Sequence, residues 1–420
     1  MKKALLIFLL LVVGRIFASS ILIPMDETQK NHLKAYGIAY WALQGNLEIH
    51  WLLNYKGGSF LIPASNAVSK ECDIRGVSYQ LISDATASSI LSEISDPEIN
   101  QDAVKLEKAP KIAVYSPPGK QPWDDAVTLV LKYAEIPYDV VYDEELYLDK
   151  LKDYDWLHLH HEDFTGQYGK FYGSFMHAAW YKAEVKSNES LAKKLGFSKV
   201  SELKLNSAKK IKDFVFSGGF LFAMCSATDT YEISLAAEGL DICESMFDGD
   251  PADKNAVTKL DFSKSFAFEN YNIIMNPLEY EHSTIDTYHT RRKFGMNEQT
   301  DVFSLFDFSA KWDPVPTMLC QNHTSTVKGF WGQTVAFKKE NVKKGVLIMG
   351  ESKAYGEARY IHGEFGKGTW TYYGGHDPED YEHRVEEPPT DLNLFPNSPG
   401  YRLILNNILF PAAKKKKQKT

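Results

Sequence analysis

The chain has 420 residues, of which 44% are hydrophobic and 24% are charged, and its formal net charge is −8. This is the composition of an ordinary globular protein with room for one large domain and a smaller one. The acidic balance argues against nucleic acid and anionic membranes as partners.

The first twenty residues are typical of a secretory signal peptide. Lys2 and Lys3 give a basic start, residues 4–14 form an apolar run too short to span a bilayer comfortably, and residues 18–20 are small. Cleavage would also remove Arg15 and move the formal charge from −8 to about −11. We therefore expect a secreted or periplasmic protein with no transmembrane anchor after cleavage. An uncleaved signal anchor is the alternative.

Residues 21–105 are expected to form a small N-terminal α/β domain. The polar segment 95–110, which contains two prolines, resembles a linker. The expected strands and helices alternate irregularly: strand 21–24, helix 27–43, strand 47–53, helix 67–72, strand 77–82 and helix 85–94.

Residues 110–412 are expected to form the main domain, because short apolar strands there alternate with helices. This pattern predicts a parallel sheet with helices on both faces. The expected elements are strand 111–115, helix 123–134, strand 138–142, helix 144–151, strand 154–158, helix 204–216, strand 219–224 and helix 230–238. Ligands of such sheets bind at the carboxyl ends of the strands, which points to residues 116–121, 160–168 and 225–229.

The rest of the main domain is less regular. Residues 248–339 are aromatic and polar, and we interpret them as an insertion. A strand is expected at 345–349, and a hairpin over 360–373 turns at Gly366-Lys367-Gly368. Residues 413–420 form a basic tail, a pattern typical of a solvated chain end.

Cys225 follows an almost purely apolar strand and precedes a helix. This arrangement is typical of a nucleophile elbow, in which a sharp turn exposes one side chain and the helix N-terminus stabilises a thiolate and an oxyanion. The alternative is a buried structural cysteine. The other cysteines are Cys72, Cys243 and Cys320, so two disulfides are possible only if Cys225 is itself paired.

His376 follows the hairpin and is itself followed by Asp377 and Glu379. A histidine oriented by a carboxylate is the base that a thiol nucleophile needs. We therefore expect Cys225, His376 and Glu379 to be catalytic, with Asp377 as the other candidate for the acid. The alternative is a histidine that caps a loop.

The run from His158 to Asp163 ends a predicted strand at the same edge of the sheet. His160, His161, Glu162 and Asp163 are expected to bind substrate, together with Ser226 and Asp229 beside Cys225. Two histidines and a carboxylate could instead hold Zn²⁺, with His177 as a further ligand. We favour a polar loop that lines the cleft, and expect no metal or other cofactor.

The segments Gly218-Gly219 to Cys225 and Gly366-Lys367-Gly368 to His376 resemble the class I glutamine-amidotransferase superfamily, and more closely its trehalose-utilisation (ThuA-like) branch. The resemblance covers residues 110–240 and 345–385, and it implies a flavodoxin-like fold. Ala223 and Ala227 depart from it, because true glutaminases of this class carry Gly-x-Cys-x-Gly. The class pattern His-Pro-Glu is also stretched to His376-Asp-Pro-Glu379.

The whole chain is also similar to secreted Bacteroidetes proteins labelled asparagine synthetase B. The enzymes of that name use an N-terminal Cys and a Ser-Gly-Gly-x-Asp-Ser loop. Here residue 2 is Lys2, and Ser217-Gly-Gly-Phe lacks the Asp and Ser. The similarity therefore does not imply that activity.

Three functions follow from these patterns. The first is a thiol hydrolase or amidase that acts on an amide or related small substrate. The second is a ThuA-like carbohydrate-binding or metal-dependent sugar-processing protein, in which Cys225 is structural. The third is a non-catalytic envelope protein. The expected partner is a small molecule or a glycan.

Overall fold

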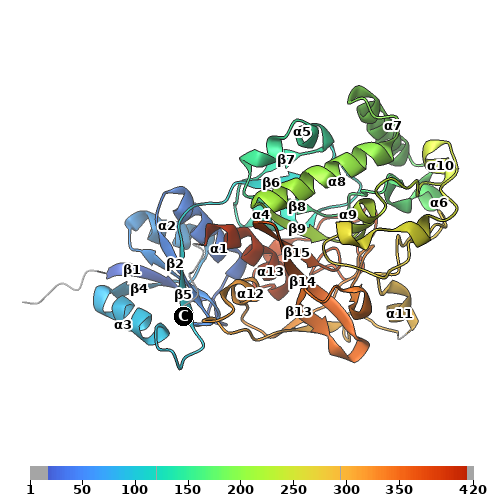
Figure 1. Cartoon of the computed structure of the whole chain (residues 1–420). Helices are drawn as coiled ribbons and strands as arrows, with labels where there is room; N and C mark the ends of the chain where they lie inside the picture. The colour runs from blue at the N-terminus through green and yellow to red at the C-terminus, as the bar shows by residue number, and fades with distance from the viewer. Residues whose placement is uncertain (1–17, 120, 294, 414–420) are drawn as a thin grey trace, which may run out of the picture.

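The computed structural model of the chain describes residues 18–119, 121–293 and 295–413, which form two β-sheets with helices packed around them (Figure 1). Most of the expected signal peptide and nearly all of the basic tail lie outside the described residues. Residues 18–20 are described, and they open strand β1 (Ala18–Ile23), in which Ser20 pairs with Pro63 and Ile82. Cleavage after residue 20, as expected from the sequence, would therefore remove the first three residues of β1, including Ser20.

The first sheet is antiparallel throughout, with strand order β4-β1-β3-β2-β5. Besides β1 it contains β2 (Ile49–Leu53), β3 (Ser59–Pro63), β4 (Gln80–Ser83) and β5 (Asp102–Leu106). Its helices are α1 (His32–Gln44), α2 (Asn66–Arg75) and α3 (Asp84–Ile94). Ser65 and Ser83 begin α2 and α3 by accepting backbone hydrogen bonds, and Gly76 ends α2 in the left-handed conformation.

The expectation of a linker over 95–110 was wrong. Residues 102–106 form β5, which pairs with β2, because Val104 and Leu106 alternate into the core although Asp102, Lys105 and Glu107 are charged. The first sheet is thus complete only when this segment is included.

The second sheet has ten strands and is mixed. The path runs β11-β10-β13-β14-β15-β9-β8-β6-β7, and β12 pairs with β14. The strands are β6 (Ile112–Tyr115), β7 (Asp139–Val141), β8 (Trp156–Leu159), β9 (Phe220–Met224), β10 (Val302–Leu305), β11 (Thr326–Lys328), β12 (Phe337–Lys338), β13 (Leu347–Ser352), β14 (Glu357–Phe365) and β15 (Gly368–Tyr373). It is parallel from β7 to β15 and antiparallel beyond, since β14 and β15 form the predicted hairpin, with Gly366 at φ +63° in its turn. The α/β prediction is confirmed, but the sheet is not purely parallel.

Helices cover both faces of the parallel part. Val114, Trp156 and Phe222 point to the face covered by α4 (Ala126–Tyr133) and α13 (Pro399–Leu409). Their neighbours Ala113, Leu157 and Leu221 point to the face covered by α8 (Val200–Ser217) and α9 (Ala227–Ala236). This alternation explains why the strands are apolar at nearly every position.

The two sheets share one hydrophobic core. That core joins α1 and the inner face of the first sheet to α4, α13 and one face of the second sheet. Figure 1 shows α13, in dark red, lying between the two sheets. Residues 18–106 are therefore packed into the main fold rather than tethered to it.

Several elements were not expected from the sequence. They include α7 (Ala179–Lys194), α13 and the strands β10 and β11 inside the presumed irregular insertion. The remaining short helices are α5 (Asp143–Tyr147), α6 (Tyr172–Phe175), α10 (Ser245–Asp248), α11 (Tyr288–Lys293) and α12 (Pro314–Leu319). The insertion thus extends the second sheet at its antiparallel edge.

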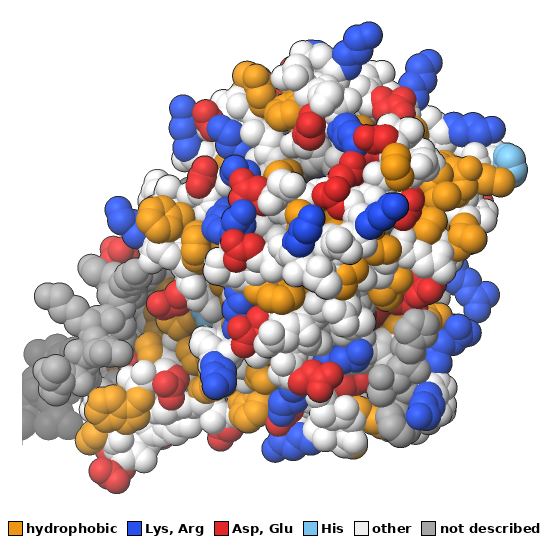
Figure 2. Space-filling model, turned by 45° about the vertical axis from the view of Figure 1, so that its right-hand side comes forward, with side chains coloured by type: hydrophobic (Ala, Val, Ile, Leu, Met, Phe, Trp, Pro, Cys, Tyr) orange, Lys and Arg blue, Asp and Glu red, His pale blue; other side chains and the backbone are white. Residues whose placement is uncertain are grey.

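Acidic and basic side chains are interspersed over the face of the molecule that Figure 2 shows. Among the residues that the structure describes, none of the helices is both long enough and apolar enough to cross a membrane.

Candidate active site

Cys225 lies at a sharp turn between β9 and α9. Its φ is +48°, a left-handed conformation that is uncommon for residues other than glycine. The Cys225 N–H donates to the carbonyl of Gly375 at 3.1 Å, and the Cys225 carbonyl accepts from the Thr228 N–H and hydroxyl. The surrounding chain therefore holds the turn that the sequence predicted for a nucleophile elbow.

The strain at Cys225 gives a stability prediction. Cys225→Gly is expected to be more stable than Cys225→Ala by about 1 kcal/mol, because glycine adopts a positive φ without the Cβ clash. Urea unfolding of the two variants measures the difference. Ala223, two residues earlier in β9, is the control position, since Ala223→Gly should lower stability by about 0.5–1 kcal/mol. A glycine at 225 that is less stable than alanine would contradict a strained turn.

His376 is brought to Cys225 by two glycines that follow β15. Gly375 has φ +104°, and a Cβ there would lie 2.4 Å from the ring of Phe330. The His376 N–H then donates to the Trp331 carbonyl at 2.7 Å. The glycines therefore let residues 374–376 pack closely against the loop that contains Phe330 and Trp331.

The side chains of Cys225, His376 and His160 form a compact group. His376 Nδ1 lies 3.1 Å from His160 Nε2, and His376 Nε2 lies 3.4 Å from Asp124 Oδ1. The Sγ of Cys225 and one ring nitrogen from each histidine all lie within 4.8 Å of one another. His383 stacks on His376 with ring centroids 4.4 Å apart, and its Nε2 is 3.2 Å from Asp124 Oδ1.

Asp124, rather than Glu379, is the carboxylate that contacts His376. Glu379 lines a different pocket beside Ser398, and its N–H donates to Asp377 Oδ1. Asp377 in turn accepts from the Thr390 hydroxyl at 2.8 Å. Asp124 therefore occupies the position beside the His376 ring that was expected for Glu379, because the chain after His376 turns away while the loop before α4 approaches.

Asp125 supports the second histidine. One of its oxygens caps α4 by accepting from the Thr128 N–H, and the other lies 3.2 Å from His158 Nε2 and 3.4 Å from His160 Nδ1. Sequence reasoning missed both aspartates. The available signal was their position in the segment between β6 and α4, which leaves the sheet at the same carboxyl edge as Cys225 and His160.

The charges in this group are set by burial and by the carboxylates. Burial lowers the pKa of His376, but the Asp124 carboxylate and the Cys225 side chain outweigh it and raise this pKa to about 10. Burial and the neighbouring His376 lower the pKa of His160 to about 4, although Asp125 opposes them. At neutral pH, His376 is therefore an imidazolium, and His160 is neutral.

The residues after His160 differ in their surroundings. His161 lines the cavity beside Cys225. Glu162 is buried behind it, accepts from the His160 N–H at 3.0 Å, and has its pKa raised to about 8 by burial. Asp163 accepts from the N–H groups of Thr165 and Gly169. Of the four expected substrate-binding residues in this loop, His161 alone lines that cavity.

Ser226 and Asp229 are buried in the first turn of α9. Asp229 accepts from the hydroxyls of Ser283 and Thr334, which attach the insertion to α9. His177 is exposed and belongs to none of the metal-compatible groups among the described residues. These three side chains therefore do not line the cavity.

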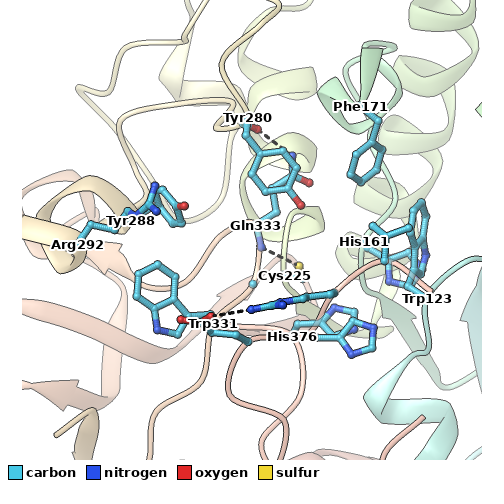
Figure 3. A pocket seen from close by; sticks show the side chains of 15 residues that line it. Trp123, His161, Phe171, Cys225, Tyr280, Tyr288, Arg292, Trp331, Gln333 and His376 are labelled. Carbon is cyan, nitrogen blue, oxygen red and sulfur yellow. Dashed lines mark hydrogen bonds and ion pairs between the residues drawn. The ribbon is translucent and has the colours of Figure 1, made fainter. Parts of the chain in front are cut away.

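A cavity of about 280 Å³ opens above Cys225 and His376. Its walls are mainly aromatic, and Figure 3 shows the rings arranged around the two residues. The lining residues are Trp123, His161, Phe171, Cys225, Tyr280, Tyr288, Arg292, Trp331, Gly332, Gln333, His376, Glu382, His383, Arg384 and Val385. The size suits a small molecule or one residue of a larger one.

The insertion supplies one wall of this cavity. The Gln333 N–H points at Cys225 Sγ from 3.3 Å, and the Gln333 side-chain amide donates to the carbonyl of Tyr280 at 2.8 Å (Figure 3). The same amide also donates to the carbonyl of Gly169 at 2.8 Å. The Gln333 backbone N–H is therefore placed to donate a hydrogen bond to the sulfur. No local sequence pattern marks Gln333, because only the packing of the insertion brings it to Cys225.

Buried ion pairs hold the loop that carries Trp331 and Gln333. Arg291 pairs with Asp301 and Glu357 at 2.5 Å each. The backbone carbonyl of Asp301 accepts from the Gly329 N–H, and Arg359 donates to the Phe330 carbonyl. The wall of the cavity is thus anchored at the start of the loop.

Among the described residues, four overlapping groups of side chains in and beside the site are close enough to hold a metal ion. They are His160 with Cys225 and His376, Asp124 with His376 and His383, Asp125 with His158 and His160, and Asp380 with His383 and Glu387.

Comparison with known proteins assigns no family. No family model matches the chain, and neither does any curated protein. Two similar solved structures are the cytoplasmic proteins STM3548 of Salmonella typhimurium and STM1381 of Salmonella typhimurium LT2, each at 12% identity and TM-score 0.35. They are covered completely and match 73% and 72% of this chain. A GH42 β-galactosidase, Gan42B, has 11% identity and TM-score 0.28 over 64% of this chain and 28% of its own. At these TM-scores the similarities assign neither fold family nor function.

Proposed function

We propose that this chain is a secreted Cys–His hydrolase or amidase built on a flavodoxin-like, class I glutamine-amidotransferase-like core. The parallel strands β7-β6-β8-β9-β15 have the chain order 2-1-3-4-5, which is the flavodoxin-like order. His160 and Cys225 directly follow β8 and β9 at their carboxyl ends, and His376 follows β15 after two glycines. The N-terminal sequence of residues 1–20 supports secretion.

One observation carries the proposal: Cys225 occupies a strained strand-to-helix turn with a carboxylate-paired His376 beside its sulfur. The thiolate attacks the carbonyl carbon of a bound amide and forms a C–S bond. The oxyanion that develops is stabilised by the backbone N–H of Ser226, the residue after the nucleophile, because the N–H groups of Ala227 and Thr228 already donate to the carbonyls of His160 and Cys225. His376 donates its proton to the leaving nitrogen as the C–N bond breaks.

Neutral His376 then takes a proton from water, and the resulting hydroxide attacks the thioester. The C–S bond breaks, the carboxylic acid leaves, and Cys225 returns as a thiolate beside the imidazolium. Asp124 keeps the ring oriented through both steps. The aromatic walls would hold the acyl part of a small substrate.

An activated acyl donor tests the nucleophile without knowledge of the natural substrate. With p-nitrophenyl acetate and a metal chelator present, we expect a burst of one nitrophenolate per protein and an acetyl group on Cys225 by mass spectrometry. Cys225→Ala should abolish the burst, whereas Cys320→Ser should retain it. A missing burst, or one that survives Cys225→Ala, would overturn the proposal.

A further inference from the structure

The same three side chains that define the proposed nucleophile site also have the arrangement of a metal centre. His160 Nε2 and His376 Nδ1 face each other at 3.1 Å, and Cys225 Sγ lies within 4.8 Å of both histidines. Two nitrogens bound to one tetrahedral Zn²⁺ at 2.0–2.1 Å would be separated by about 3.3 Å. Only a small movement would therefore let both nitrogens bind one ion.

In each histidine, a carboxylate lies near the ring nitrogen that does not face the other histidine. His160 Nδ1 lies 3.4 Å from Asp125 Oδ2, and His376 Nε2 lies 3.4 Å from Asp124 Oδ1. In metalloproteins such a carboxylate holds the proton on the outer nitrogen and turns the other nitrogen toward the metal. Here His160 Nε2 and His376 Nδ1, the nitrogens that face each other, would both point at the same position beside Cys225.

The two carboxylates are themselves held in place. Asp125 is fixed by the start of α4 and by His158, and Asp124 is contacted by His383, which stacks on His376. The rings of His160 and His376 are buried. The donors are thus preorganised, which lowers the cost of gathering them around an ion.

We infer that Cys225 Sγ, His160 Nε2 and His376 Nδ1 form a site for Zn²⁺ or a similar borderline-soft divalent ion. One thiolate and two imidazoles favour such ions over Mg²⁺ and Ca²⁺, which prefer oxygen ligands. Cys225 and His376 line the cavity, so a fourth ligand, a water or a substrate atom, would come from that side.

Metal binding has a direct consequence for the proposed hydrolase. The ion would occupy the sulfur lone pair and replace the proton on His376 Nδ1, so the protein would lose its nucleophile and its acid together. Binding would release that proton, and zinc would act as a reversible inhibitor of the thiol chemistry. The metal site does not rest on the hydrolase proposal, because it depends only on the three ligands.

Co²⁺ is the probe for this site, since it substitutes for Zn²⁺ and reports its ligands by absorption. We expect metal-free protein titrated with Co²⁺ to show a near-ultraviolet thiolate charge-transfer band and the visible bands of tetrahedral cobalt, both displaced by one equivalent of Zn²⁺. Cys225→Ser should lose the charge-transfer band. Asp125→Asn should weaken binding about 10–100-fold, and His160→Ala should weaken it more.

His362→Ala is the matched control, because His362 is a buried histidine on β14 that contacts Thr371 away from the site. The Co²⁺ affinity of the His362→Ala variant should equal that of the wild type. Far-ultraviolet circular dichroism establishes that each variant is folded. Cobalt binding without the charge-transfer band, or unchanged in Cys225→Ser, would overturn the metal site, as would no binding at micromolar concentrations.

The two proposals fail separately. The nitrophenolate burst is measured with a chelator and tests the thiol alone, whereas cobalt absorption tests the metal ligands alone. Cobalt binding without a burst would remove the hydrolase and leave the metal site. If the protein binds no cobalt and Zn²⁺ does not suppress the burst, the metal site would be overturned and the hydrolase proposal would remain.

Discussion

His376→Ala is expected to lower the rate at which iodoacetamide alkylates Cys225 at pH 6.5 by about 100-fold. An ordinary thiol has a pKa of about 8.5 and is about 1% thiolate at this pH. In the wild type, the Asp124 carboxylate and the Cys225 side chain raise the pKa of His376 to about 10, so a positive charge lies beside Cys225 Sγ. His376→Ala removes that charge. The rate is measured by quenched labelling and mass spectrometry of the peptide that contains Cys225, with chelator present.

The labelling can be assigned to one residue. Cys72 and Cys243 are buried, and burial raises the pKa of Cys72, Cys243 and Cys320 above the ordinary value. His362→Ala again removes a buried imidazole away from the site and should leave the rate unchanged. Equal labelling of Cys225 in the wild type and in His376→Ala would contradict a thiolate–imidazolium pair.

Asp124→Asn is expected to slow the nitrophenolate burst by about 10²–10⁴-fold, while Glu379→Gln leaves it within about twofold. Replacing the carboxylate of a catalytic histidine by an amide typically costs up to about 10⁴ in rate, because the ring loses its orientation and its charge partner. Asp124 lies 3.4 Å from His376 Nε2, whereas Glu379 lines a separate pocket. Stopped-flow absorbance measures the burst rate of both variants.

The pH dependence of the burst gives a second readout. A carboxylate favours the protonated ring, so Asp124→Asn should lower the pKa of His376 from about 10 toward the ordinary value of about 6.5. The imidazolium would then be lost as the pH rises through neutrality rather than near pH 10. A slow Glu379→Gln variant beside a normal Asp124→Asn variant would restore the role that the sequence suggested for Glu379.

The aromatic walls of the cavity and the position of Gln333 could not be predicted from the sequence. The apolar strand into Cys225 and the Gly-Lys-Gly hairpin into His376 are contiguous patterns, and the periodicity of the parallel strands predicted which edge of the sheet they share. Gln333 and Trp331 come from an insertion whose fold depends on buried ion pairs between distant residues.

The sequence by itself determined the α/β class, the turn at Cys225 and the placement of His376 after the hairpin, because each depends on residues adjacent in the chain. Only the tertiary structure decided the partners of these groups. Asp124 replaces Glu379 and His160 joins the pair, since loops from different strands converge at one edge of the sheet. It also decided that residues 18–106 belong to the main fold, because a shared core arises from long-range packing that leaves no local pattern.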